Sequence, residues 1–392
     1  MKRVICCLCT VVLLVFLNTQ AFALSDESIE PTGLDELNFE VNAKSAVLME
    51  ANTGKILFKQ NEDLQSSPAS VTKIMTLLLV AEAISAGKIS TEDSVIISAH
   101  AASMGGSQVF LEEGERMTVE ELIKCTVIAS ANDAAVALAE HVSGSEKIFV
   151  SMMNKRAKEL KMENTNFENV TGLDDSTKNH VTTAEDIAIM SRELIKYDLI
   201  KKYSSLWQDT IRNGEFTLTN TNRLVRFYDG CNGLKTGSTD KAGYCISATA
   251  ERGEMQLIAV IMGAETRDIR NAQAKSMLDF GFSNYTVFKQ DEKALESVDI
   301  LYGLKENTTL YSSPFSAVIP KGELKNVEMF YEIPESVTAP IKQYDIVGKI
   351  TYKIGDEILG TSNIYVNEEI DKISFADIFF KIIKNLFVGN SK

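Results

Sequence analysis

The sequence predicts an α+β protein, in which an antiparallel sheet carries a helical subdomain and is followed by a small all-β domain and a terminal amphipathic helix. Helical periodicity gathers in the middle of the chain, whereas apolar runs typical of strands lie near 44–58 and 244–262. Four of the six prolines fall within 314–340, among short strand-like segments. Residues 371–388 repeat with a helical period. These patterns predict divisions at 1–23, 24–285, 286–368 and 369–392.

The N-terminus has the features of a secretory signal peptide. It begins with basic Lys2 and Arg3, continues with an apolar stretch over 4–17, and reaches a small-x-small site at 21–23. A transmembrane anchor is the alternative, but the apolar stretch is short for a bilayer span. We therefore expect cleavage after residue 23 and export of the mature chain.

Charge and cysteine content exclude several classes of function. The chain has 54 acidic and 40 basic residues, a net charge of −14, which makes it a poor nucleic-acid binder. Three of the six cysteines would leave with the signal peptide, and three would remain: Cys125, Cys231 and Cys245. An odd number cannot form a disulfide framework, although one pair could form. We expect these three cysteines to be free thiols that pack in the core. The three histidines are scattered without zinc-ligand spacing, so we expect no metal and no cofactor.

The middle of the chain can be divided into elements from turn, capping and periodicity signals. A long irregular segment over 164–180 separates two groups of helices. Two capping boxes, each a threonine followed three residues later by a glutamate, predict helix starts. The predicted elements are a hairpin over 44–58, a helix from Ser70 to about Gly87, helices starting at Thr118-x-x-Glu121 and Thr182-x-x-Glu185, helices over 134–141 and 145–160, antiparallel strands over 244–250 and 255–262, and a helix over 268–280.

Ser70 and Lys73 form a candidate nucleophile and base. Pro68 precedes them and favours a helix start, and residues three apart share one helix face. Burial would depress the pKa of the lysine, and free N–H groups at the helix N-terminus favour developing negative charge. Ser-x-x-Lys alone is weak, because an N-cap serine beside a solvated lysine has the same spacing.

Two further motifs in order make this pattern specific. Ser70-Val-Thr-Lys73, Ser130-Ala-Asn132 and Lys235-Thr-Gly237 together resemble the serine acyl-enzymes that include β-lactamases and penicillin-binding proteins. With the surrounding sequence, residues 40–285 resemble the D-alanyl-D-alanine carboxypeptidases, the low-molecular-weight penicillin-binding proteins. The resemblance implies a β-lactamase/transpeptidase-like fold. The stretches that carry it are 67–76, 106–108, 129–134, 171–174 and 233–237.

The resemblance implies a serine-type carboxypeptidase that removes the terminal D-alanine of peptidoglycan stem peptides ending in D-Ala-D-Ala. Ser70 would attack the penultimate carbonyl, and Lys73 would take its proton. Ser130 would relay a proton to the leaving nitrogen, and Asn132 would hold the substrate amide. The N–H groups of Ser70 and Ser238 would form the oxyanion hole.

The same resemblance implies how the substrate's terminal carboxylate is bound. Lys235 would supply a fixed positive charge, and Thr236 would offer a hydroxyl. Gly237 would let the substrate backbone approach the strand edge. Arg270 would add positive charge, with a surface salt bridge as its alternative role.

Two departures from β-lactamases bear on the choice of activity. The second motif is Ser-Ala-Asn rather than Ser-Asp-Asn, and 161–175 contains no Glu-x-x-Leu-Asn pattern to place a deacylating glutamate. We therefore expect β-lactams to acylate Ser70 as covalent inhibitors with slow release. The alternatives are a D,D-endopeptidase, a β-lactamase, and a wall-binding or β-lactam-sensing module without turnover. Asp174 and Asp175 either shape the deacylation pocket or cap a loop, and His180 is expected to be structural.

The C-terminal segment predicts attachment to a membrane surface. Its polar residues fall on one narrow face of a helix, and its apolar residues fill a wide arc. It could pack on its own domain, but its aromatic residues and lysines favour a membrane interface, and it is too interrupted to span. We therefore expect the protein on the extracytoplasmic face of the cell membrane. The polar face consists of Ser374, Asp377, Lys381, Lys384 and Asn385.

Overall fold

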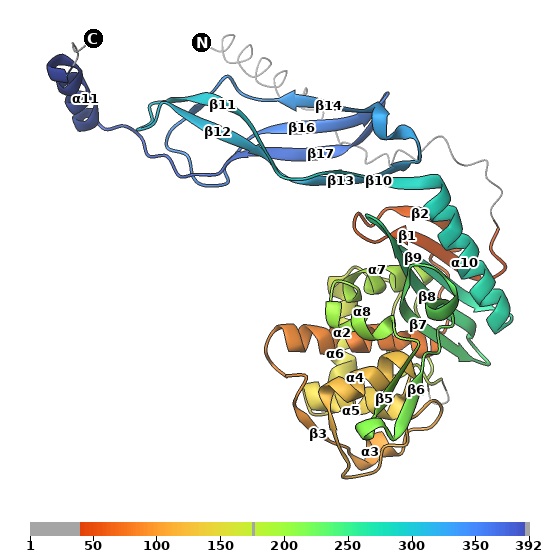
Figure 1. Ribbon diagram of the computed structural model, residues 1–392. Helices are drawn as coiled ribbons and strands as arrows, with labels where there is room; N and C mark the ends of the chain where they lie inside the picture. The colour runs from red at the N-terminus through yellow and green to blue at the C-terminus, as the bar shows by residue number, and fades with distance from the viewer. Residues whose placement is uncertain (1–39, 175–176, 389–392) are drawn as a thin grey trace, which may run out of the picture. The chain divides into compact units, whose positions relative to one another are not determined.

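The computed structural model describes residues 40–174 and 177–388. The predicted signal peptide and cleavage site lie outside the described residues, as does Asp175. Within them, helices and strands are mixed as the sequence predicts, so the α+β class is confirmed (Figure 1).

A five-stranded antiparallel sheet forms the frame of the first domain. Its order is β2-β1-β9-β8-β7, so β1 pairs with β9, a strand from more than 200 positions later in the chain, and β2 lies at the edge. The hairpin expected over 44–58 and the antiparallel neighbours expected over 244–262 are both present. The strands are β1 (Ser45–Glu50), β2 (Ile56–Gln60), β7 (Cys231–Thr239), β8 (Gly243–Arg252) and β9 (Met255–Ala264).

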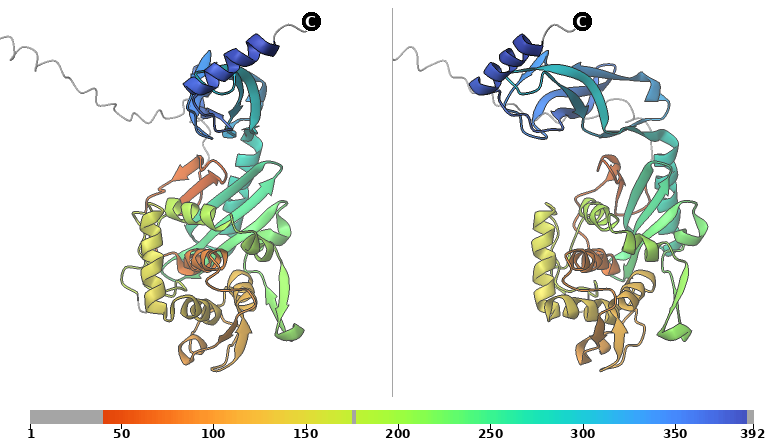
Figure 2. Two further views of the ribbon diagram at one scale, coloured as in Figure 1. Left: turned by 90° about the vertical axis from the view of Figure 1, so that its left-hand side faces the viewer. Right: turned by 60° about the vertical axis from the view of Figure 1, so that its left-hand side comes forward.

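Helices cover both faces of this sheet (Figure 1). Alternate residues of the strands divide between the two sides: Val47 and Val260 belong to the helical core, whereas Leu48 and Leu257 meet α10 (Arg267–Asn284) close to Gly281. Figure 2 shows the helical cluster from two further sides. That cluster consists of α2 (Lys73–Ser85), α3 (Ala99–Ala102), α4 (Val119–Ile128), α5 (Asn132–Ser143), α6 (Glu146–Glu159), α7 (Ala184–Leu194) and α8 (Asp198–Ser204), while the short α9 (Leu224–Phe227) packs on β7.

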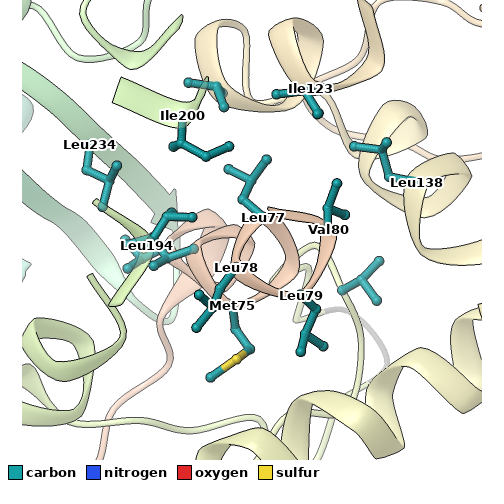
Figure 3. Close-up of a cluster of buried hydrophobic side chains, with 14 of the residues drawn as sticks. Met75, Leu77, Leu78, Leu79, Val80, Ile123, Leu138, Leu194, Ile200 and Leu234 are labelled. Atoms are coloured by element: carbon teal, nitrogen blue, oxygen red, sulfur yellow. The ribbon is translucent and has the colours of Figure 1, made fainter. Parts of the chain in front are cut away.

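Helix α2 runs through the centre of the helical cluster. Ten of its 13 residues are buried, because its sequence is apolar almost all round. It starts later than expected, since Ser70 lies in a 3₁₀ turn, η1 (Ala69–Thr72), that leads into the helix. Residues three apart eclipse in a 3₁₀ turn, so Lys73 still lies over Ser70. Figure 3 shows Met75, Leu77 and Leu78 of α2 together with side chains from the elements around it, among them Ile123, Leu138, Leu194, Ile200 and Leu234.

The two predicted capping boxes had different outcomes. Thr118 and Glu121 form the expected reciprocal box at the start of α4. The second prediction was one residue early: Thr183 caps α7 by accepting the Asp186 N–H. The backbone of Thr182 instead pairs with Ser66 in an antiparallel bridge, and so it is held extended before the cap.

Smaller elements complete the first domain. A short pair, β3 (Ser94–Ile96) and β4 (Arg116–Thr118), precedes α4. A second hairpin, β5 (Gln208–Ile211) and β6 (Phe216–Thr219), turns through η2 (Arg212–Gly214).

The C-terminal domain is all-β, as predicted. A six-stranded sheet has the order β14-β16-β17-β12-β11-β15, and β10 pairs with β13. Apolar side chains such as Leu310, Ile350 and Ile364 form its core. Helix α11 (Phe375–Val388) follows. The strands are β10 (Tyr285–Gln290), β11 (Lys293–Leu301), β12 (Asn307–Ser312), β13 (Phe315–Pro320), β14 (Val327–Glu332), β15 (Ser336–Thr338), β16 (Ile346–Ile354) and β17 (Glu357–Val366), with η3 (Glu323–Asn326) between β13 and β14.

Candidate active site

A cleft of about 420 Å³ brings together residues from all three motifs. Ser70 comes from η1, Ser130 from the loop before α5, and Thr236, Gly237 and Ser238 from β7. Lys73 and Lys235 are fully buried directly behind it. The cleft is lined by Ser70, Ser107, Ser130, Trp207, Thr219, Asn220, Thr221, Arg223, Thr236, Gly237, Ser238, Arg267 and Arg270.

The Lys73 amine is arranged as a base for Ser70. Its Nζ lies 3.0 Å from Ser70 Oγ, 2.5 Å from Asn132 Oδ1 and 2.9 Å from the Thr171 carbonyl oxygen. Burial, with a smaller contribution from Lys235, lowers the pKa of Lys73 well below its usual value. A neutral amine has two N–H donors, which the two carbonyl oxygens accept. Its lone pair is then left to accept the Ser70 O–H.

Ser130 and Lys235 form a second hydroxyl–amine pair across the cleft. The Lys235 Nζ donates to Ser130 Oγ at 2.8 Å and to the Thr236 carbonyl oxygen at 2.8 Å. Burial first, and then Arg270, lower the pKa of Lys235 to about 7. The sequence led us to expect a fixed charge, but burial makes this charge depend on pH near neutrality. Ser130 has φ of +63°, a left-handed conformation that costs on the order of 1 kcal/mol and is held by its surroundings.

Gly237 is required by the protein's own packing. A Cβ at this position would lie 2.8 Å from Ser70 N, 2.9 Å from Pro68 O and 2.9 Å from Val71 N. The absence of a side chain at Gly237 lets β7 approach η1, which brings the backbone of Ser238 beside that of Ser70. The approach of a substrate backbone to the same strand stays a prediction.

The irregular segment over 164–180 packs behind Ser70 and Lys73. A Cβ on Gly172 would lie 1.8 Å from the Ala69 carbonyl oxygen, and the φ of Gly172 is +82°. Only glycine therefore lets this segment approach η1 closely enough for Thr171 to accept from the Lys73 amine. Asp174 accepts a hydrogen bond from Thr239 at 2.7 Å, which joins the segment to the end of β7.

His180 holds the same segment in place. Its Nδ1 accepts the Glu168 N–H at 3.0 Å, so its Nε2 carries the proton and donates to Thr72 Oγ1 at 2.8 Å. Burial lowers the pKa of His180 to about 4, which keeps the ring neutral at pH 7. This agrees with the structural role expected for it.

Asn132 is occupied by contacts within the protein. Its Oδ1 accepts from Lys73, and its Nδ2 donates to the Gly105 carbonyl oxygen at 2.7 Å. These contacts position Lys73, and the substrate contact that we expected of Asn132 stays a prediction. The neighbouring Asp133 was not singled out from the sequence. It is fully buried, accepts the N–H groups of Val109 and Leu111, and opposes the lowering of the Lys73 pKa.

The wall formed by Trp207 and residues 219–223 was also missed. Thr221 Oγ1 lies 2.9 Å from Thr236 Oγ1, and Asn220 donates to the Ser204 and Leu206 carbonyl oxygens. The β5–β6 hairpin carries this wall. Asn-Gly at 213–214 is a hairpin signal that could have located it.

Arg270 reaches the cleft from the first turn of α10. Its side chain is buried and donates to Asn271 Oδ1 and to the Cys245 carbonyl oxygen. Burial first, and then Arg267, lower the pKa of Arg270 to about 10. The surface salt bridge that we considered as its alternative role is not formed with any residue that the structure describes.

The remaining cysteines are free, buried thiols. Burial raises the pKa of Cys125 and raises that of Cys231 to about 11, so neither is an activated nucleophile. Across 40–174 and 177–388, no three metal-ligating side chains come together.

Comparison with known proteins agrees with this geometry. The family model for D-alanyl-D-alanine carboxypeptidase matches residues 30–266, and that for the penicillin-binding protein 5 C-terminal domain matches 282–372. D-alanyl-D-alanine carboxypeptidase DacF of Bacillus subtilis is 43% identical over 383 residues, 96% of each chain.

Solved structures are similar as well. Penicillin-binding protein 5 from Haemophilus influenzae matches with a TM-score of 0.76 and 33% identity, over 85% of this chain and 99% of that one. Penicillin-binding protein D2 from Listeria monocytogenes in its ampicillin-bound form matches with a TM-score of 0.58 and 31% identity, over 62% of this chain and 99% of that one. With a family model matching more than half of its length, the chain belongs to the D-alanyl-D-alanine carboxypeptidase family of low-molecular-weight penicillin-binding proteins and is a serine-type carboxypeptidase.

Proposed function

We propose that this carboxypeptidase removes the terminal D-alanine from peptidoglycan stem peptides through an acyl-enzyme on Ser70. The observation that carries the proposal is the fully buried Lys73 amine, 3.0 Å from Ser70 Oγ, whose pKa is lowered well below its usual value. An amine that is neutral at working pH can act as a general base, which an ordinary surface lysine cannot do. The named activity of the relatives supports the choice of a D-Ala-D-Ala substrate.

Acylation follows from the contacts around Ser70. Lys73 accepts the hydroxyl proton while Ser70 Oγ attacks the penultimate carbonyl carbon, and the N–H groups of Ser70 and Ser238 hold the oxyanion. When the carbon–nitrogen bond breaks, Ser130 passes its proton to the leaving nitrogen and takes up the proton that Lys73 had accepted, which leaves Lys73 neutral again. Lys235, which donates to Ser130 Oγ at 2.8 Å, stabilises the serine oxygen during that transfer.

Deacylation reuses the same base. Lys73 takes a proton from water, the hydroxide attacks the acyl carbon, and Ser70 Oγ leaves with a proton. The departing D-alanine carboxylate is held before cleavage by Thr236 and Arg270, which line the cleft together. Lys235 adds positive charge when it is protonated.

The experiment that tests this activity follows the acyl-enzyme and the product together. Intact mass after mixing with benzylpenicillin, with peptide mapping of the adduct, should show a persistent adduct on Ser70, and a D-Ala-D-Ala peptide should release D-alanine. Ser70→Ala should lose both reactions, whereas the exposed serine variant Ser103→Ala should keep both. An adduct on another residue would refute the nucleophile assignment.

The same assay separates the alternatives. Rapid loss of the adduct with drug consumption would indicate a β-lactamase. A persistent adduct without D-alanine release would indicate a sensing module. Release only from a cross-linked peptide would indicate a D,D-endopeptidase.

We further propose that the mature chain is exported and that α11 lies in the membrane interface. Large apolar side chains on α11 face solvent: Phe375 is 84% exposed, Phe380 67% and Phe379 52%. No helix among the described residues is long and apolar enough to cross a bilayer. An amphipathic helix with exposed aromatic residues binds instead in the plane of the interface.

Vesicle sedimentation tests this location. Removing 375–392 should abolish pelleting with phosphatidylglycerol vesicles while peptide hydrolysis in solution continues. Phe379→Ser with Phe380→Ser should weaken pelleting, whereas Phe330→Ser, an exposed phenylalanine of β14, should not. Pelleting of the truncated protein would contradict the proposal.

A further inference from the structure

The cleft is positively charged although the chain as a whole is acidic. Its lining includes Arg223, Arg267 and Arg270 and, among the described residues, no aspartate or glutamate. The Lys235 amine behind the same cleft adds positive charge when it is protonated. Because the whole chain carries a net charge of −14, this concentration of cations points to an anionic ligand.

Arg223 and Arg267 have no acidic partner within the described part of the chain. Both are exposed at the cleft, and neither forms an ion pair there. Glu265 and Asp268 flank Arg267 in sequence, yet neither lines the cleft. All three arginines line one cleft, and burial first, then the charges of Arg267 and Arg223, lower the pKa of Arg270. A bound anion would relieve this repulsion.

The two arginines lie on the leaving-residue side of the cleft. Arg267 precedes Arg270 by three positions in α10, and so shares its helix face. Arg223 follows Thr221 by two positions, and Thr221 touches Thr236. Thr236 and Arg270 are the groups that would hold the terminal carboxylate. They suffice for its two oxygens, which leaves Arg223 and Arg267 for a second anionic group.

We propose that Arg223 and Arg267 form a second anion subsite, which binds a side-chain carboxylate of the leaving residue. The substrate class then includes peptides ending in an acidic D-amino acid as well as those ending in D-alanine. The inference rests on the proposed function, because the terminal amide bond of such a peptide is cleaved through the same Ser70 acyl-enzyme. Ser130 protonates the nitrogen of the leaving acidic amino acid, and water then hydrolyses the acyl-enzyme.

Matched peptides test this subsite. Peptides ending in D-Ala-D-Glu and D-Ala-D-Gln differ by one charge at nearly equal size, and D-Ala-D-Ala serves as the reference. Charge-assisted bonds to an arginine are expected to give the D-glutamate peptide roughly a tenfold higher kcat/KM than the D-glutamine peptide. Arg223→Gln with Arg267→Gln should bring this ratio close to one. Arg116→Gln, an exposed arginine of β4 outside the cleft, should keep it.

The outcomes separate failure of the subsite from failure of the activity. If the unmodified protein hydrolyses all three peptides but shows no preference for D-glutamate, the subsite is overturned and the carboxypeptidase activity stands. The subsite is also overturned if an acidic side chain raises kcat/KM only when it lies in the part of the peptide that stays on Ser70, and not in the leaving residue. If no peptide is hydrolysed and Ser70 forms no adduct with benzylpenicillin, the proposed function fails and the subsite fails with it. A D-glutamate preference that shrinks as salt is raised supports the subsite.

Discussion

Replacement of Gly237 by alanine tests whether the close approach of β7 to η1 builds the active site. The new Cβ would meet three backbone atoms, the nearest of them Ser70 N at 2.8 Å. Ordinary contact begins near 3.4 Å, and backbone cannot swing aside as a flexible side chain can. Strand and turn must therefore separate by about half an ångström, which widens the space between the N–H groups of Ser70 and Ser238.

The expected effect is larger on catalysis than on folding. A misplacement of about 1 Å in an active site can cost on the order of 10²-fold in rate, so a shift half as large should slow acylation about tenfold. Overpacking of this kind should lower the free energy of unfolding by about 1–3 kcal/mol.

The assay is the second-order rate of Ser70 acylation by benzylpenicillin, measured by intact mass, with thermal unfolding recorded alongside. Gly105→Ala is the matched control, because a Cβ there meets nothing within 4 Å and its φ is not positive. Both variants should unfold cooperatively, and only Gly237→Ala should acylate slowly. If folded Gly237→Ala acylates as fast as the unmodified protein, the packing argument for the oxyanion hole is refuted.

Three further predictions concern the buried polar groups. Because the pKa of Lys235 is about 7, the kcat/KM for a D-Ala-D-Ala peptide should fall as pH rises above 7. Lys235→Arg keeps its charge at higher pH, so it should flatten this fall, at lower overall activity. If the arginine variant shows the same fall, the titrating group is not Lys235. Asn132→Ala removes the 2.5 Å contact to Lys73 and should slow the acylation of Ser70 by benzylpenicillin about 10²-fold. A loss of substrate affinity alone would instead support a direct contact between Asn132 and the substrate. The pKa of His180 is about 4 in the folded protein and about 6.5 when unfolded, so about 3 kcal/mol of stability present above pH 6.5 should be lost progressively as pH falls to 4. In urea unfolding, the free energy of unfolding of His180→Gln should not show this loss between pH 6.5 and 4.

Much of the fold could be predicted because its signals are local. Two apolar-rich segments around the turn at 52–54 locate the first hairpin, and continuous apolar sequence predicts that α2 is buried. The capping box at Thr118 is confirmed for the same reason, since both of its hydrogen bonds close within four residues. The box at Thr182 was wrong because a distant partner, Ser66, holds its backbone extended.

In the candidate site too, local motifs could be predicted from the sequence, whereas contacts between distant segments could not. Three short motifs in order identify the reactive side chains, because each chemistry needs its residue types at fixed spacing. The contacts that set their charge states come from far along the chain: Asn132 and Thr171 bind Lys73 across 59 and 98 positions.

By itself, the sequence determined the class of fold, the family resemblance and the identity of the reactive groups, since these depend on residue type and local spacing. Only the tertiary structure decided that Asn132 contacts the base, that Gly237 lets β7 approach η1, and that Arg223 and Arg267 share one cleft with Arg270. The physical reason is that burial, close packing and the sum of nearby charges are properties of surroundings. Those surroundings are assembled from segments that the sequence keeps apart.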